Sequence, residues 1–128
     1  MEFPEGLKYS KEHEWVLVEG TSATIGITEY AQKELGDVVF VELPPAGKPV
    51  TSGGVLGNIE SVKAVSEVFA PVGGEVATAN LELEAHPELV NQDPYGKGWL
   101  VRLKVSGAPA GVMDAAAYER FLAEEGAH

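Results

Sequence analysis

The sequence contains no cysteine among its 128 residues, and this absence excludes several kinds of chemistry. Without a thiol the chain cannot form a disulfide, present a thiolate nucleophile or build a cysteine-based metal site. Redox chemistry in this protein therefore needs a group that is added to the chain. Histidine is also scarce: His13-Glu14 is not part of a His-Glu-x-x-His motif, and His86 and His128 lie in unrelated contexts. No metal site is expected.

Basic residues are few, because 9 Lys and Arg stand against 20 Asp and Glu, which leaves a formal net charge of −11. This balance excludes binding to nucleic acid or to an anionic membrane surface, since phosphate contacts need clustered basic side chains. No apolar run approaches the roughly 20 residues of a membrane span. Met1–Glu5 lacks the basic and apolar regions of a secretory signal. We expect a soluble protein of a bacterial cytoplasm or, as a mature chain, of the mitochondrial matrix.

Short apolar runs separated by 15 glycines and 8 prolines predict a small, mainly β protein. The length suits a single domain that spans residues 1–128. Ala23, Ile25 and Ile27 alternate with small or polar residues, as in a half-buried strand. Strands are expected at residues 14–19, 21–27, 38–43, 55–60, 65–70, 75–78 and 99–105.

Two helices are expected to interrupt the strands. A short helix near residues 28–35 has Thr28 as a suitable N-cap and Gly36 as a suitable end. A C-terminal helix near 114–125 can be capped by Asp114. Its apolar side chains form a narrow stripe, which predicts that the helix docks on the surface and does not form a core.

A weak internal repeat links residues 45–50 and 71–76, which share the pattern Pro-x-Gly-x-x-Val at an offset of 26 residues. The two copies are either similar turns that each enter a strand, or the halves of a duplicated hairpin unit related by a pseudo-two-fold axis. In the second interpretation, the midpoint between the copies lies near residue 60, close to Lys63.

Lys63 lies at the predicted turn between the fourth and fifth expected strands. Its neighbours Val62, Ala64 and Val65 are small or apolar, whereas turns usually carry polar residues. Most lysines on loops are simply solvated. An amine on a tight turn with apolar neighbours is, however, what a modifying enzyme needs in order to attach a prosthetic arm at a fixed point.

The lysine turn has the sequence Glu60-Ser61-Val62-Lys63-Ala64 and is followed by the glycine-containing segment 71–76. Both resemble the attachment region of lipoyl-carrying domains. Matching segments cover nearly the whole chain, and in this order and spacing they resemble the H proteins of the glycine cleavage system. These segments are residues 7–9, 13–15, 23–28, 35–44 and 89–99. The Val-Lys-Ala core differs from that of biotin carriers, which typically place methionine on both sides of the lysine.

The resemblance implies a flattened β-sandwich or hybrid barrel of the lipoyl-domain type, and a carrier with no catalytic activity of its own. It implies lipoate attached covalently as lipoyl-lysine at Lys63, with Glu60, Ser61, Val62 and Ala64 as the attachment hairpin. The lipoyl arm would take an aminomethyl group from a pyridoxal-phosphate glycine decarboxylase (P protein) to a tetrahydrofolate-dependent aminomethyltransferase (T protein). Dihydrolipoamide dehydrogenase (L protein) would reoxidise the dithiol, and a lipoate attachment enzyme would add the arm to a monomeric carrier.

Three acidic residues are candidates for the cleft in which the loaded arm rests. From the residues alone, Glu14 is most simply a solvated carboxylate at a strand end. The resemblance implies instead that Glu14, and more loosely Glu67, lie near this cleft and pair with the ammonium of the loaded arm. Glu12 is a third candidate, at a position where a small polar residue is expected in the family.

Other interpretations stay open at this stage. The chain could be a biotinyl carrier, an H-like protein for lipoate relay, or an unmodified β domain for protein contacts. Segment 91–99 is explained by turns at Pro94 and Gly96 with Trp99 packed inward, or by docking of a partner. A hydrolase fits least, because the sequence has no Gly-x-Ser-x-Gly motif and no suggestive arrangement of Ser, His and Asp.

Overall fold

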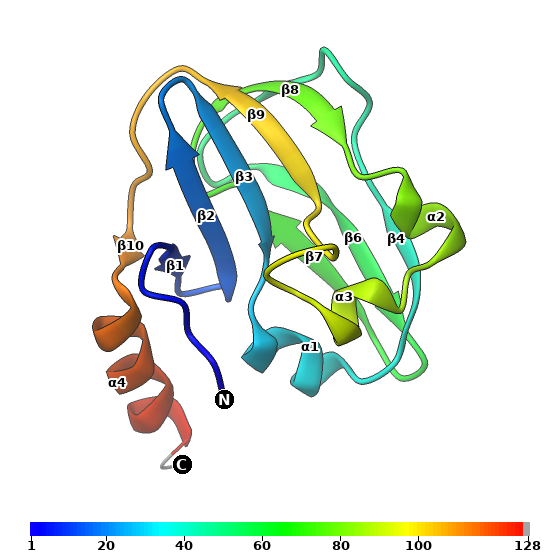
Figure 1. The fold of residues 1–128 in the computed structure, drawn as a ribbon, viewed down its shortest axis with the longest axis vertical. Coiled ribbons are helices and arrows are strands. Elements are labelled where there is room, and N and C mark those ends of the chain that lie inside the picture. Colours follow the sequence, from blue (N-terminus) through cyan, green and yellow to red (C-terminus); the bar gives the residue numbers. More distant parts are fainter. Residues whose placement is uncertain (127–128) are drawn as a thin grey trace.

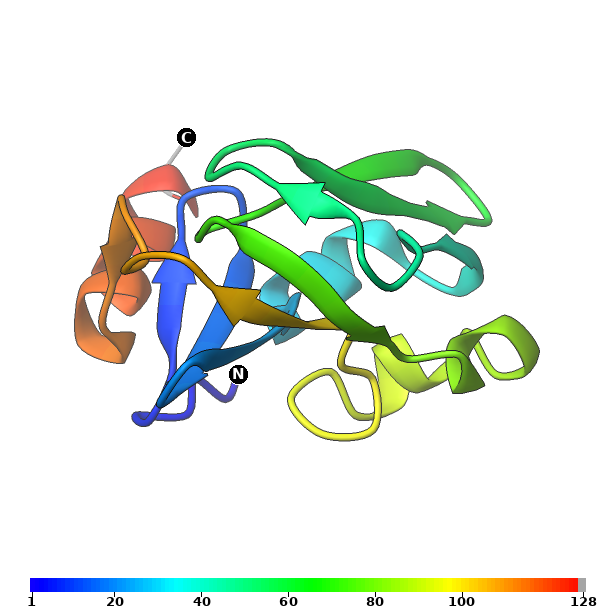
Figure 2. The same ribbon diagram turned by 90° about the horizontal axis from the view of Figure 1, so that it is seen from above.

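The computed structural model describes residues 1–126 and consists of two antiparallel β-sheets packed face to face (Figures 1 and 2). The larger sheet has seven strands in the order β10-β1-β2-β3-β9-β8-β5, and the smaller has three in the order β4-β6-β7. The strands are β1 (Lys8–Ser10), β2 (Glu14–Glu19), β3 (Ser22–Ile27), β4 (Val38–Glu42), β5 (Pro49–Val50), β6 (Val55–Ser61), β7 (Val65–Phe69), β8 (Gly74–Ala79), β9 (Val101–Val105) and β10 (Val112–Met113). The predicted mainly β architecture is confirmed.

Both predicted helices are present, with the predicted caps. The Thr28 hydroxyl accepts a hydrogen bond from the Ala31 amide at 3.1 Å, and α1 (Glu29–Leu35) ends at Gly36, which has a φ of 77°. The Asp114 carboxylate accepts from the Ala117 amide at 2.8 Å at the start of the C-terminal helix. The sequence did not predict two single-turn helices between β8 and β9. The remaining helices are α2 (Glu82–Ala85), α3 (Leu89–Gln92) and α4 (Ala115–Gly126).

The main hydrophobic core lies between the two sheets. Ala23, Ile25 and Ile27 of β3 are all buried, as their alternation predicts. The alternating pattern of residues 99–105 predicted a strand that starts two residues too early. Strand β9 begins at Val101, while Leu100 is buried in the main core and Trp99 is only partly buried, in a separate cluster.

A second, smaller cluster is built around the C-terminal helix, which lies outside the sheets against β1 and β10 (Figure 1). Tyr118 of α4 is fully buried, and its ring stacks on Tyr9 with centroids 4.8 Å apart. Leu7 and Trp15 belong to the same cluster. The helix docks outside the sheets as predicted, but the prediction that it forms no core was wrong, because its Tyr118 is fully buried in this second cluster.

The segment from β5 to β8 folds back on itself as a ribbon. Val50 is paired with Gly74 near its open end, and Glu60 with Val65 near its closed end. The first pair is centred on residue 62 and the second between residues 62 and 63, so the repeated segments 45–50 and 71–76 lie at the same end of the ribbon. The closed end is the turn that carries Lys63.

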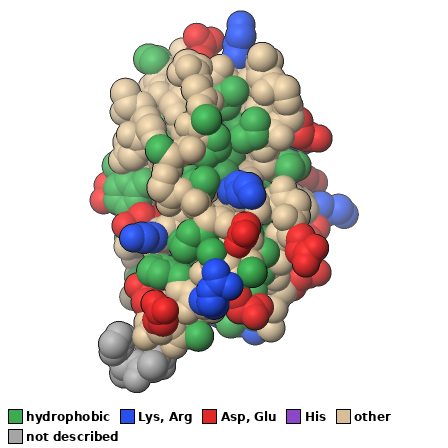
Figure 3. All heavy atoms as spheres, turned by 90° about the vertical axis from the view of Figure 1, so that its left-hand side faces the viewer, with side chains coloured by type: hydrophobic (Ala, Val, Ile, Leu, Met, Phe, Trp, Pro, Cys, Tyr) green, Lys and Arg blue, Asp and Glu red, His purple; other side chains and the backbone are tan. Residues whose placement is uncertain are grey.

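The side of the molecule formed by α4 and β10 carries charged side chains of both signs around α4, and hydrophobic side chains gather above the helix (Figure 3). A shallow apolar groove is lined by Val16, Val18, Val105 and Val112. Among the described residues, no helix is both long enough and apolar enough to cross a membrane.

Candidate functional site

The turn between β6 and β7 comprises Ser61–Ala64 and is called the lysine hairpin below. The Ser61 amide donates to the Ala64 carbonyl at 2.8 Å. The Ser61 hydroxyl oxygen accepts from the amides of Lys63 at 3.3 Å and Ala64 at 3.1 Å. The turn contains no glycine, and His13 is the one described non-glycine residue with a positive φ. The buried Ser61 side chain thus supplies the acceptor that closes the turn.

Lys63 is exposed at the closed end of the ribbon, where the strand pattern placed it. None of the ion pairs found within residues 1–126 involves this lysine. Its stem passes Gly36, since a Cβ built on that glycine would lie 3.7 Å from Lys63 Cε. Val62 and Val65 beside it are 69% and 66% exposed, so the amine stands among uncovered apolar side chains. Glu60 lies on β6 and is also exposed.

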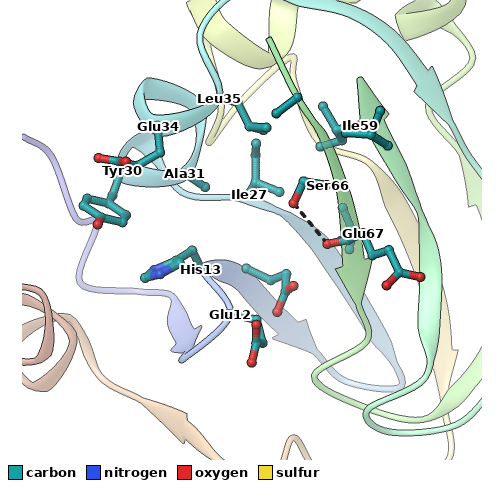
Figure 4. A pocket seen from close by; sticks show the side chains of 14 residues that line it. Glu12, His13, Ile27, Tyr30, Ala31, Glu34, Leu35, Ile59, Ser66 and Glu67 are labelled. Atoms are coloured by element: carbon teal, nitrogen blue, oxygen red, sulfur yellow. Dashed lines mark hydrogen bonds between the residues drawn. The ribbon is translucent and has the colours of Figure 1, made fainter. Parts of the chain in front are cut away.

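A cleft of about 440 Å³ begins next to the lysine hairpin, between α1, β7 and the turn that precedes β2 (Figure 4). The structure brings all three predicted acidic residues, Glu12, Glu14 and Glu67, into its lining, although Glu67 is more than 50 positions from the other two in the chain and lies in the other sheet from Glu14. The full lining consists of Glu12, His13, Glu14, Ile27, Tyr30, Ala31, Glu34, Leu35, Ile59, Ala64, Val65, Ser66, Glu67 and Val68. Because Ala64 is among these residues, the cleft opens directly beside Lys63.

Glu14 is buried, with only 2% of its surface exposed, so its interpretation as a solvated strand-end carboxylate was wrong. One carboxylate oxygen accepts from the Phe69 amide at 3.0 Å, and the other accepts from the Ser10 hydroxyl. Burial raises the pKa of Glu14, and these two hydrogen bonds oppose part of that rise. Glu14 therefore joins β2 of the larger sheet to the end of β7 in the smaller sheet.

Glu12 and Glu67 differ from Glu14 because both are exposed at the cleft. Glu12 approaches from the turn between β1 and β2, and Glu67 from β7 (Figure 4). Neither carboxylate has a side-chain hydrogen bond or ion pair with another described residue. Their charges are thus available to a cationic group that enters the cleft.

His13 is a cleft residue that the sequence suggested only as part of a metal or acid–base motif. Its Nδ1 lies 2.8 Å from the Tyr118 hydroxyl oxygen, which is also 2.9 Å from the Thr28 hydroxyl oxygen. Burial lowers the pKa of His13. These contacts connect α4 to the cleft wall. They could not be predicted from local sequence, because Tyr118 is 105 positions from His13 in the chain. Within residues 1–126, no three His, Asp or Glu side chains could hold a metal ion together.

The class of this protein follows from the comparison of folds. The chain matches the crystal structure of a glycine cleavage system H protein from Mycobacterium marinum with a TM-score of 0.88 and 33% identity. The match covers 97% of this chain and 99% of that one. The two packed sheets are therefore those of a lipoyl-carrier domain.

Sequence comparisons give the particular family. The family model described as glycine cleavage H-protein matches residues 7–125. The glycine cleavage system H protein of Herpetosiphon aurantiacus is 56% identical over 95% of each chain. That of Rubrobacter xylanophilus is 53% identical over 97% of this chain and 98% of its own.

The chain belongs to the glycine cleavage H-protein family. It is a lipoyl carrier of the glycine cleavage system, and its role is that of a non-catalytic component. The family resemblance of the lysine turn and its flanking segments is thereby confirmed.

Proposed function

We propose that Lys63 is the residue that carries lipoate and that the cleft beside it receives the arm. The observation that carries this proposal is the position of Lys63: it is exposed at the closed end of the ribbon, and the cleft begins at the next residue, Ala64. Glu60, Ser61, Val62 and Ala64 form the attachment hairpin around it.

The residues present fit this group. Amide formation with lipoate needs an accessible primary amine on a stable turn, and the Ser61 side chain holds the turn of Lys63 in place. The cleft has apolar lining for a hydrocarbon arm, supplied by Ile27, Ala31 and Leu35 among others. When bound, the lipoyl group supplies a disulfide that takes up an aminomethyl group with two electrons, and a dithiol that returns the electrons.

The chain's own contribution is to shelter this chemistry. The exposed carboxylates of Glu12 and Glu67 would attract a cationic amine into the cleft, since opposite charges interact more strongly where water is partly excluded. The apolar lining would keep water away from a labile cargo. Buried Glu14 would act differently, by holding the two walls together through the Phe69 amide.

We infer that the carrier is first modified by a lipoate attachment enzyme. It then passes between glycine decarboxylase (P protein), the aminomethyltransferase (T protein) and dihydrolipoamide dehydrogenase (L protein). Membership of the H-protein family supports this set of partners. Because the relatives compared are bacterial, we propose a cytoplasmic site of action, with residues 1–128 acting as one monomeric carrier domain.

Peptide mass spectrometry across residues 55–71, after expression with active lipoylation, tests the attachment site. The wild-type peptide should carry a lipoyl mass, and Lys63→Arg should carry none, because arginine keeps the charge but has no acylatable amine. Lys48→Arg, at the open end of the ribbon, is the control and should remain modified. Lipoyl mass in the Lys63→Arg protein would overturn the proposal, and a biotinyl mass on Lys63 would support a biotin carrier instead.

A further inference from the structure

The loop Gly36–Val38, called the platform loop below, joins α1 to β4 and lies beside the lysine hairpin in both views (Figures 1 and 2). The Asp37 carbonyl accepts a hydrogen bond from the Val62 amide at 3.0 Å. The aliphatic part of the Lys63 side chain passes close to Gly36, because a Cβ added to that glycine would be in van der Waals contact with it. The platform loop is therefore hydrogen-bonded to Val62 and lies close to the side chain of Lys63.

The lysine hairpin has this support on one side only. In the smaller sheet β6 is paired with β4, whereas β7 forms the edge of the sheet. Val38 is paired with Ser61 at the hairpin end of that ladder. The direction in which the turn projects therefore depends on how firmly the platform loop is held.

Asn91 of α3 holds the platform loop at both ends. Its Oδ1 accepts from the Val38 amide at 2.9 Å, and its Nδ2 donates to the Gly36 carbonyl at 2.8 Å. The same Nδ2 donates to Gln32 Oε1 at 3.0 Å, which fixes the orientation of the amide against α1. One side chain thus satisfies a carbonyl left free at the end of α1 and the first amide of β4.

We propose that Asn91 is a positioning residue for the modification of Lys63. It fixes the platform loop, the Asp37 carbonyl fixes the Val62 amide, and the turn then presents the lysine amine in one orientation. An attachment enzyme gains from this order because a preorganised substrate loses less conformational freedom on binding. The inference rests on the proposed role of Lys63 and gives a function to a segment that the sequence explained only by turns or docking.

Amide hydrogen exchange in the unmodified full-length protein tests the first step, with Asn91→Ala compared with Asn80→Ala. Asn80 serves as the control because it is a buried asparagine whose Nδ2 also donates two hydrogen bonds, to the carbonyls of Lys97 and Trp99, both at 2.8 Å. Exchange of the Val62 amide should become about tenfold faster in Asn91→Ala, and should change by less than about twofold in Asn80→Ala.

Steady-state modification by a lipoate attachment enzyme, with lipoate and ATP, tests the consequence. For Asn91→Ala, kcat/KM should fall about tenfold, mainly through a higher KM for the carrier, while Asn80→Ala should stay close to wild type. If Asn91→Ala does not fold, Asn91→Asp keeps the acceptor for the Val38 amide and removes both donors, and the same two changes are expected.

Unchanged Val62 exchange, or equal kinetic losses in the Asn91 and Asn80 variants, would overturn the proposal. These outcomes are separate from a failure of the proposed function. Exchange at Val62 is measured without any modification, whereas the identity of the modified lysine is decided by the Lys63→Arg mass comparison.

Discussion

The glutamates of the cleft are the same residue type, but they differ in burial and in hydrogen bonding. Glu14 is 2% exposed and accepts hydrogen bonds from the Ser10 hydroxyl and the Phe69 amide. Glu67 is exposed on β7. A change of carboxylate to amide should therefore affect folding at one position and the cargo at the other.

The Glu14→Gln variant tests the structural role. Burial raises the pKa of Glu14 in the folded state above its value in the unfolded chain. Between the two pKa values the folded state binds more protons, so the free energy of unfolding falls as pH rises through that interval. Glutamine cannot ionise and still offers an oxygen to the Phe69 amide, so this part of the pH dependence should disappear from denaturant unfolding curves measured between about pH 4 and pH 8.

The Glu67→Gln variant is the matched control for that measurement and should follow the wild-type pH dependence. In the modified protein, however, it should release ammonia from its one-carbon cargo several-fold faster, because a carboxylate that favours the docked amine is gone. If Glu14→Gln keeps the wild-type pH dependence, or Glu67→Gln retains its cargo as long as wild type, the assignment of these two roles is wrong.

Among the elements, α4 is connected to the cleft by more than apolar packing. The Tyr118 hydroxyl lies within hydrogen-bonding distance of His13 and Thr28, and its ring stacks on Tyr9. Tyr118→Phe keeps the ring and removes the hydroxyl, so the free energy of unfolding should fall by about 1–3 kcal/mol. Chemical denaturation measures this, with exposed Glu119→Gln on the same helix as a control that should stay within about 0.5 kcal/mol. Equal stabilities of Tyr118→Phe and wild type would show that the hydroxyl contributes nothing net.

Elements with strong local signals were predictable from the sequence, and elements formed by tertiary pairing were not. Capped helices and the alternating strand β3 were found because their periodicity and caps lie within a few residues. The strands β5 and β10 have two residues each and exist only because a distant strand lies beside them. The site followed the same division: the lysine turn was recognisable, while the contact of Glu14 with Phe69, 55 positions away, was not.

For the whole molecule, the net charge of −11 bears on how the carrier finds its partners. Long-range attraction to basic docking surfaces speeds association and is screened by salt. The association rate with glycine decarboxylase should therefore fall by about tenfold between about 50 mM and 500 mM NaCl in stopped-flow measurements. Glu60→Gln, near the lysine, should reduce the association rate more than Glu75→Gln at the open end of the ribbon. An association rate that does not change with salt would show that electrostatic attraction does not speed the encounter.

The pairing of residues 49–75 about residue 62 has a consequence for how this chain can vary in length. An insertion of one residue in one arm that is neither matched in the other arm nor taken up by a bulge would shift the register and turn every following side chain of that arm to the opposite face of its sheet. The apex would then fall on another residue, and the amine would point elsewhere. Length changes in this segment should therefore leave the amine in place only where they come in compensating pairs or are absorbed by a bulge, as the unmatched residue between Val55 and Gly57 is.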